Sequence, residues 1–418
     1  MVLEITIPNE QIQLIKPIKT ALEAHDNFIK PILTHPSSPS CKVIRTNLED
    51  VPTYLSKYID SNHLQVQRST LELVSGKKAK NDILKFTKDW FSLYHAINDN
   101  TLIDRLIEHT PYRYSKYPPL LLFNNSTVRS FDHDVWKYNV PDDVRGQYFH
   151  DLLKYLSNND NESTYRYIGI NKPIIYDDVM RQPKNIKIVY PSDSTDEIWC
   201  QLKQNGIWQV WNPLYTMFSR GNIKEKKRIL DTFHGSCKDI DVVDLYCGIG
   251  YFSFSYLFNG ARNVFGFDIN PWSIKGLQEG LRLNKFGPTR CHFYNESNEM
   301  SIERIQQYRD SECNGEKLLI RHINLGLLPS SRQGWPIALK IIDIHSDLER
   351  VPDQRVTLHI HENVHIDQIE DDSFVQDTVI PGLRHLNAKY HYRKVHVEKI
   401  KTFAPDIWHV CIDIDVYR

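Results

Sequence analysis

The chain has 418 residues, of which 41% are hydrophobic and 25% charged, so it is an ordinary globular protein long enough for two or three domains. Its 51 basic and 52 acidic residues leave a net charge of −1, which excludes a globally basic nucleic-acid binder and requires any polyanion site to be a local patch. The absence of a long apolar run and of a signal peptide predicts a cytosolic protein, and seven scattered cysteines without zinc-ligand spacing predict reduced thiols.

The N-terminal part of the chain has no single dominant pattern. Residues 10–30 carry apolar side chains at helical spacing and residues 31–40 are rich in proline and serine, so residues 1–40 are expected to form a helix and a linker. From residue 41 onward, short strand-like runs alternate with helical runs. This mixture predicts a smaller α+β domain over residues 41–200.

Two strand-like runs precede the C-terminal half. Residues 186–190 and 206–211 are predicted to pair as a hairpin that leads into the next domain. After Asn222, helical and strand-like runs alternate, which is typical of βαβ units and a parallel sheet. The predicted fold class is therefore α/β, with a Rossmann-like domain over residues 201–418.

A glycine-rich turn follows the strand-like run 241–246. Gly248 and Gly250 let the backbone bend sharply and approach a ligand, while the next helix directs its N–H groups at that ligand. A dinucleotide fingerprint would need a third glycine where Ser253 stands. With Asp244 at the strand end to meet an amino group, the loop instead favours S-adenosylmethionine.

Asp268 closes the next strand-like run, twenty residues after Gly248, at the offset where a carboxylate can hydrogen-bond ribose hydroxyls. A pair of glycines alone is also explained by a tight turn, but the pair and the acid together predict a nucleoside cofactor. Ser297 and Asn298 follow a third strand, where a methyltransferase-like fold places polar groups against adenine; a turn without function is the alternative. These features predict a class I methyltransferase-like Rossmann domain.

Two further groups of titratable residues have competing interpretations. His359 and His361 share one face of a predicted strand, a spacing that metal sites also use. Buried or edge histidines of a sheet are the simpler explanation, so no metal is predicted. Arg220, Lys224 and Lys227 are candidate RNA contacts, with a solvated helix face as the alternative.

Residues 200–418 also carry a series of short motifs. These are Asn-Gly-Ile at 205–207, Thr-Met-Phe-Ser-Arg-Gly-Asn at 216–222, Glu-Lys at 225–226, the glycine loop 244–252, Asn-Pro at 270–271, and the runs 324–331, 359–364 and 401–405 with His409. Together they closely resemble the motifs of the tRNA wybutosine-synthesising protein 2 family, a sister of the tRNA guanosine-37 N1-methyltransferases.

The resemblance implies an enzyme that transfers the 3-amino-3-carboxypropyl group of S-adenosylmethionine, its co-substrate, to carbon 7 of 4-demethylwyosine at position 37 of phenylalanine tRNA. The second product is 5′-methylthioadenosine. By the same resemblance, Ser219 and Lys226 contact the cofactor, Asp268 holds the ribose, and Ser297 with Asn298 meets the adenine. The cofactor's orientation then selects the carbon that reacts, with little acid–base machinery. No obligate protein partner is indicated.

Two positions depart from the patterns of related families. Residues 296–299 read Glu-Ser-Asn-Glu where the family has Gly-Asp-Asn-Arg, which alters the expected adenine contact. Asn324, expected to position the substrate, is followed by Leu-Gly, whereas many amino-group methyltransferases carry Asn-Pro-Pro here.

The first alternative to aminocarboxypropyl transfer is guanosine-37 N1-methylation, which would prefer the Asn-Pro-Pro motif. A non-catalytic RNA-binding module is the second. Under the main interpretation as well as these alternatives, the domain at 41–200 is expected to bind the tRNA.

Overall fold

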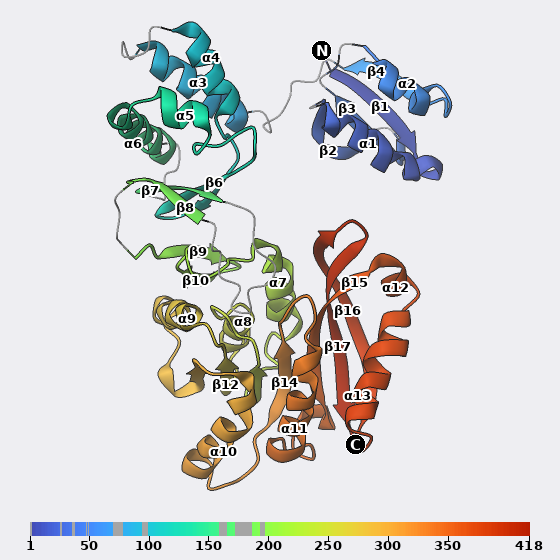
Figure 1. Ribbon diagram of the computed structural model, residues 1–418. Coiled ribbons are helices and arrows are strands. Elements are labelled where there is room, and N and C mark those ends of the chain that lie inside the picture. Colours follow the sequence, from blue (N-terminus) through green and yellow to red (C-terminus); the bar gives the residue numbers. More distant parts are fainter. Residues whose placement is uncertain are drawn as a thin grey trace. The chain divides into compact units, whose positions relative to one another are not determined.

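The computed structural model describes residues 2–25, 27–35, 38–46, 48, 50–69, 78–93, 99–158, 165–171, 186–192 and 197–418. The chain divides into two compact units, Met1–Arg113 and Tyr114–Arg418, and each is considered by itself (Figure 1). Among the described residues, none of the helices combines the length and the apolar composition that crossing a bilayer requires.

The first unit contains a four-stranded antiparallel sheet in the order β2-β3-β1-β4. Its elements are β1 (Val2–Pro8), α1 (Ile15–Ala24), β2 (Phe28–His35), β3 (Ser38–Thr46), α2 (Thr53–Ile59), β4 (Gln65–Ser69), α3 (Lys78–Leu93) and α4 (Asn100–His109). Ile5 and Ile7 alternate along β1 and pack against Ile18 and Leu22 of α1. The helix expected within residues 10–30 is present as α1. The expected linker at 31–40 is wrong, because β2 and β3 occupy most of it and β3 crosses the expected boundary at 40.

The second unit begins with a sheet in the order β5-β6-β7-β8, followed by a hairpin of β9 and β10. Its first elements are β5 (Tyr114–Tyr117), β6 (Leu120–Asn124), α5 (Asp134–Asn139), α6 (Asp142–Asn158), β7 (Tyr167–Asn171), β8 (Ile186–Tyr190), β9 (Cys200–Gln204) and β10 (Ile207–Trp211). The predicted pairing of 186–190 with 206–211 is wrong, because β8 pairs with β7 and β10 pairs with β9. Asn205 and Gly206 both have positive φ and form the tight turn between β9 and β10. The expected domain boundary at 200 falls inside β9.

A seven-stranded sheet in the order β13-β12-β11-β14-β15-β17-β16 forms the centre of the remaining chain. The first five strands are parallel, and β17 is antiparallel to both of its neighbours. The elements are α7 (Ile223–Thr232), β11 (Asp241–Asp244), α8 (Ser253–Phe258), β12 (Asn263–Phe267), α9 (Pro271–Asn284), β13 (Cys291–Tyr294), α10 (Ser301–Glu312), β14 (Ile320–Leu325), α11 (Trp335–His345), β15 (Val356–His365), α12 (Ile366–Glu370), α13 (Ile380–Leu386), β16 (His391–Ala404) and β17 (Ile407–Tyr417). This arrangement confirms the predicted α/β, Rossmann-like fold class.

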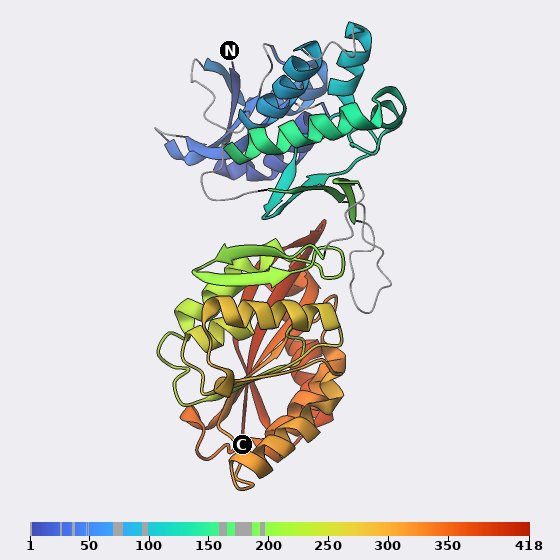
Figure 2. The same cartoon turned by 90° about the vertical axis from the view of Figure 1, so that its left-hand side faces the viewer.

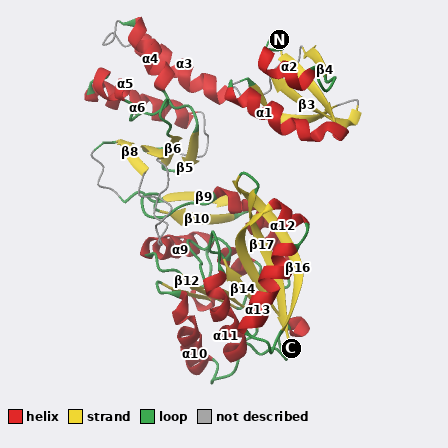
Figure 3. Ribbon diagram, turned by 45° about the vertical axis from the view of Figure 1, so that its right-hand side comes forward, coloured by secondary structure: helices red, strands yellow, loops and turns green. Residues whose placement is uncertain are grey.

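Helices cover both faces of this sheet. Val242 and Val264 pack with α7, α8 and α9 on one face, whereas the next residues along each strand, Val243 and Phe265, pack with α10 and α11 on the other. Figure 2 shows α9 (yellow) next to the β9–β10 hairpin (light green), which it contacts. Figure 3 shows α13 beside the three long strands β15, β17 and β16. The loops that follow the parallel strands are therefore held on a layer buried from both sides.

Candidate functional site

A cavity of about 380 Å³ opens at the carboxyl ends of the central parallel strands. The strand order reverses around β11, between β12 and β14, and open α/β sheets bind their ligands at such a reversal. Loops after β10, β11, β12, β13 and β14 line the cavity, together with residues of β15, β16 and β17. The expected site residues in this lining are Ser219, Gly248, Asp268, Ser297 and Asn298.

The glycine loop after β11 is tied to Asp268. Gly248 has a φ of 53°, in the region that favours glycine, and its N–H donates to Asp268 Oδ2 at 3.0 Å. The Asn270 N–H donates to Asp268 Oδ1 at 2.9 Å. Burial raises the pKa of Asp268 to about 6 despite these two donors. Each carboxylate oxygen keeps a further lone pair, so Asp268 can accept hydrogen bonds from hydroxyl groups in the cavity.

Asp244 and Gly250 belong to the glycine loop but are not among the described residues that line the cavity. Asp244 is fully buried and accepts a hydrogen bond from Ser253 Oγ at 2.7 Å, and its burial raises its pKa to about 6. A Cβ on Gly250 would lie 2.5 Å from the ring of Phe254. Both residues therefore shape the loop, and Asp244 is placed away from the cavity in which an amino group was expected to meet it.

Ser297 and Asn298 follow β13 and line the cavity between two acids, Glu296 and Glu299. Ser297 Oγ accepts a hydrogen bond from the Glu299 N–H at 3.3 Å. Arg304 Nε donates to Glu296 at 2.8 Å, and this hydrogen bond lowers the pKa of Glu296. The loop thus presents a hydroxyl and an amide, which together offer donors and acceptors to the edge of a base.

Ser219 and Lys226, expected to act together, have different positions. Ser219 lines the cavity, and its N–H donates to the Tyr251 hydroxyl at 3.2 Å. Lys226 is buried behind the lining, where Nζ donates to Gln204 Oε1 at 2.5 Å and to Gln209 Oε1 at 2.6 Å. Burial lowers the pKa of Lys226 to about 7. Its Nζ lies 5.7 Å from the centre of the Tyr251 ring, so Lys226 supports the cavity wall from behind.

Asn324, the expected substrate-positioning residue, is fully buried near the end of β14. The Tyr256 hydroxyl donates to its Oδ1 at 3.4 Å. Gly326, Leu327 and Leu328, a few residues further along, line the cavity in its place. The structure therefore places Asn324 outside the described cavity wall.

The candidate RNA contacts Arg220, Lys224 and Lys227 are exposed and lie outside the cavity lining. Arg220 donates to Ser115 Oγ at 3.0 Å, and Lys227 forms an ion pair with Asp231 at 2.8 Å. Exposed ion pairs of this kind are weak, so they exchange readily for contacts with a polyanion.

The cavity lining also contains His361 of β15, Lys401 of β16 and His409 of β17, which were not expected as cofactor-binding residues. His361 Nδ1 lies 2.8 Å from His409 Nε2, and the His361 ring stacks on Phe252 with 4.9 Å between ring centres. Burial, with the nearby His409, holds the pKa of His361 well below 6.5. The sequence signals were the alternation of His359 and His361 and the resemblance of the run 401–405 with His409. Only strand pairing brings Lys401 and His409 to the cavity.

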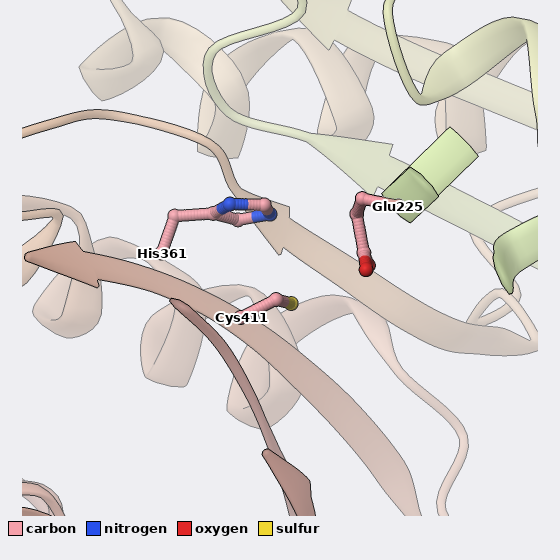
Figure 4. Close-up of side chains that lie close together, drawn as sticks. All are labelled: Glu225, His361 and Cys411. Atoms are coloured by element: carbon pink, nitrogen blue, oxygen red, sulfur yellow. The ribbon is translucent and has the colours of Figure 1, made fainter. Parts of the chain in front are cut away.

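A group of buried donor atoms lies between α7 and the sheet. The side chains of Glu225, His361 and Cys411 point toward one another, with donor atoms within 4.8 Å (Figure 4). Arg228 donates to Glu225 at 2.7 and 2.8 Å and to Asp413 at 2.6 Å. Burial raises the pKa of Cys411 well above its usual value. Arg228 supplies positive charge to Glu225 and Asp413, and the expectation that this chain holds no metal stays a prediction.

Comparisons with known proteins identify the relatives of this chain. The profile of the TRM5/TYW2 methyltransferase domain matches residues 201–307. The chain is 41% identical to tRNA wybutosine-synthesizing protein 2 of Saccharomyces cerevisiae, over 97% of this chain and 96% of the relative. It is 34% identical to the Schizosaccharomyces pombe protein of the same name, over 73% and 72%. The crystal structure of P. horikoshii TYW2 in complex with MeSAdo shares the fold, with a TM-score of 0.52 and 19% identity over 82% of this chain and 99% of that one. The resemblance found in the motifs is thereby confirmed, and the chain belongs to the tRNA wybutosine-synthesizing protein 2 family.

Proposed function

We propose that this chain transfers the 3-amino-3-carboxypropyl group of S-adenosylmethionine to carbon 7 of 4-demethylwyosine at position 37 of phenylalanine tRNA. The bond between sulfur and the aminocarboxypropyl carbon breaks, so 5′-methylthioadenosine (MeSAdo) leaves, and the hydrogen on carbon 7 leaves as a proton. The observation that carries the proposal is the 41% identity, over 97% of the chain, to the yeast tRNA wybutosine-synthesizing protein 2. The P. horikoshii TYW2 of similar fold was crystallised in complex with MeSAdo, which agrees with this product.

The cavity fits S-adenosylmethionine in size and in chemistry. Its volume of about 380 Å³ lies in the range of small-molecule sites, and its lining mixes apolar and polar groups. Asp268 would accept hydrogen bonds from the ribose hydroxyls, and Ser297 with Asn298 would meet the adenine edge. Gly248, without a side chain, leaves the backbone close to the ligand. The bound sulfonium supplies electrophilic carbons next to sulfur.

The residues of the chain contribute chiefly by orientation. Asp268 is fixed by two backbone N–H groups, so the nucleoside it holds has one defined position. Phe252, Leu327 and Ile337 form apolar parts of the wall, which exclude water from a reactive group. Which carbon reacts then depends on which one is held in line with the nucleophile. No acid–base pair is needed to activate a leaving group that is already positively charged.

The tRNA is held by contacts outside the cavity. We assign tRNA binding to the region 41–200 and to the exposed Arg220, Lys224 and Lys227. Because the net charge is −1, only local basic patches can bind the phosphates of the tRNA. We further propose a cytosolic enzyme that needs neither a metal nor an obligate protein partner. The sequence supports this part of the proposal, because its cysteines lack zinc-ligand spacing and it has no long apolar run.

Two labelled forms of S-adenosylmethionine test the reaction. The protein is incubated with phenylalanine tRNA that carries 4-demethylwyosine, and with cofactor labelled either on the methyl carbon or on the carboxyl carbon. We expect only the carboxyl label in the RNA. Methyl label in the RNA would establish guanosine methylation or another methyl transfer instead, and absence of both labels would favour a binding module.

A further inference from the structure

Acidic side chains line one end of the cavity, and a lysine lines the other. Asp268, Glu296 and Glu299 follow β12 and β13 on one side of β11. Lys401 and His409, which belong to β16 and β17, lie on the other side, with β14 and β15 in between. Among the described residues that line the cavity, Lys401 is the one lysine or arginine. A ligand that spans the cavity is therefore expected to carry hydroxyls at one end and an anionic group at the other.

Lys401 is placed at this end by three separate contacts. Its Nζ donates to Ser219 Oγ at 3.1 Å, which joins β16 to the loop after β10. Its strand partner in β17 is His409, which also lines the cavity. A Cβ on Gly221 would lie 2.4 Å from Lys401 Cδ, so the missing side chain at Gly221 makes room for the lysine.

We propose that Lys401, together with the Ser219 hydroxyl, binds the carboxylate of the aminocarboxypropyl arm of S-adenosylmethionine. This inference rests on the proposed function. With the nucleoside at the acidic end, the arm extends toward β15–β17, and its carboxylate is the anionic group that an ammonium recognises by a charge-assisted hydrogen bond. Lys401 is then a positioning residue: by fixing the far end of the arm, it fixes the carbon that faces the acceptor.

Calorimetric titration with three ligands isolates the carboxylate. S-adenosylmethionine has the whole arm, its decarboxylated form lacks only the carboxylate, and 5′-methylthioadenosine lacks the arm. We expect Lys401→Met to weaken binding of S-adenosylmethionine by about ten- to a hundredfold, the range of a hydrogen bond to a charged group, and to leave the other two affinities unchanged. Lys399→Met is the matched control, because Lys399 is exposed on the same strand and absent from the cavity lining.

A second variant moves the lysine without removing its charge. Gly221→Ala pushes the Lys401 side chain aside, so we expect a selective loss of affinity for S-adenosylmethionine that is smaller than in Lys401→Met.

Unchanged affinity for S-adenosylmethionine in Lys401→Met would overturn the proposal. If that variant instead had a raised KM for tRNA, the lysine would be assigned to an RNA phosphate. Equal weakening of all three ligands would also overturn it, as a general loss of structure. If the unaltered chain transferred methyl label, the proposed function would fail, while these affinities would still decide the carboxylate contact.

Discussion

Asp268 combines a fixed position with a raised pKa. Burial raises this pKa to about 6, so the carboxyl group is ionised at pH 7 and largely protonated at about pH 5. A protonated carboxyl accepts fewer hydrogen bonds from ribose hydroxyls. We therefore expect the affinity for S-adenosylmethionine to fall as the pH falls through 6, as measured by calorimetric titration.

Asp268→Asn tests whether this carboxylate is the group responsible. We expect the variant to bind S-adenosylmethionine more than tenfold more weakly at neutral pH, since a hydrogen bond to a charged group contributes about 1.5–3 kcal/mol. The difference from the unaltered chain should shrink below pH 6. Asp239→Asn is the control, because Asp239 is an exposed acid outside the cavity lining. Equal affinities for the Asp268 variant and the unaltered chain would refute the ribose contact.

Some site residues were predictable from the sequence and others were not. Asp268 and Gly248 follow strands directly, so strand order alone places them at the carboxyl edge. Lys226 is one residue of an amphipathic helix, and only tertiary packing decides whether its long side chain reaches the cavity or, as here, two glutamines behind it. Lys401 needed the pairing of β16 with β17 to reach the site, a contact that no local pattern in the sequence shows.

Helix α9 depends on a close approach to the β9–β10 hairpin. A Cβ on Gly276 would lie 2.4 Å from the Val210 carbonyl oxygen, which is backbone and cannot rotate away. Asn284 at the end of the helix exchanges two hydrogen bonds with the Trp208 backbone, at 2.8 and 2.7 Å. We expect Gly276→Ala to destabilise the second unit by roughly 1–3 kcal/mol, as overpacking does. The midpoint of thermal unfolding reports this loss.

Gly287→Ala provides the comparison for that variant. Gly287 lies just beyond α9 with a φ of −67°, and a Cβ there meets nothing within 4 Å. Its replacement should change stability by less than about 0.5 kcal/mol. Alanine normally favours a helix over glycine by about 1 kcal/mol. A stabilised Gly276→Ala variant would therefore show that the helix is free to move away from the hairpin.

The alternating elements of the Rossmann-like part were predictable because each strand is short, apolar and followed by a helix with its own periodicity. The predicted hairpin was wrong because the apolar runs 186–190 and 206–211 are alike in pattern, whereas the Asn-Gly turn at 205–206 pairs β10 with β9. At 1–40 the proline-rich stretch suggested a linker, although β1 alternates Leu3, Ile5 and Ile7 in the pattern of a strand.

At the scale of the whole second unit, buried histidines link stability to pH. Burial holds the pKa of His322 and His361 well below 6.5 and lowers that of His345 to about 4. These groups stay neutral in the folded state but take up protons on unfolding below pH 6.5, so stability falls as the pH falls. The raised pKa values of Asp244 and Asp268, about 6, act in the opposite direction between about pH 6 and 4.

The loss of stability caused by the three histidines exceeds the gain caused by the two aspartates as the pH falls from 7 to 5.5. We expect the free energy of unfolding of the second unit to be lower by roughly 2 kcal/mol at about pH 5.5 than at about pH 7. The slowest-exchanging backbone amides of β15 and β17, corrected for intrinsic exchange rates, measure this difference. Equal or greater protection at the lower pH would mean that these histidines become protonated without unfolding.

The long hairpin of β16 and β17 lets the cavity bind the two ends of its ligand by separate parts of the fold. The nucleoside end of the cavity is built by loops after β12 and β13, whereas Lys401 and His409 belong to paired strands at the opposite edge of the sheet. An antiparallel pair at an edge tolerates exchange of its side chains without any change in the order of the parallel strands. Substitutions in this hairpin can therefore change which group of S-adenosylmethionine is transferred, while the residues that bind its nucleoside stay the same.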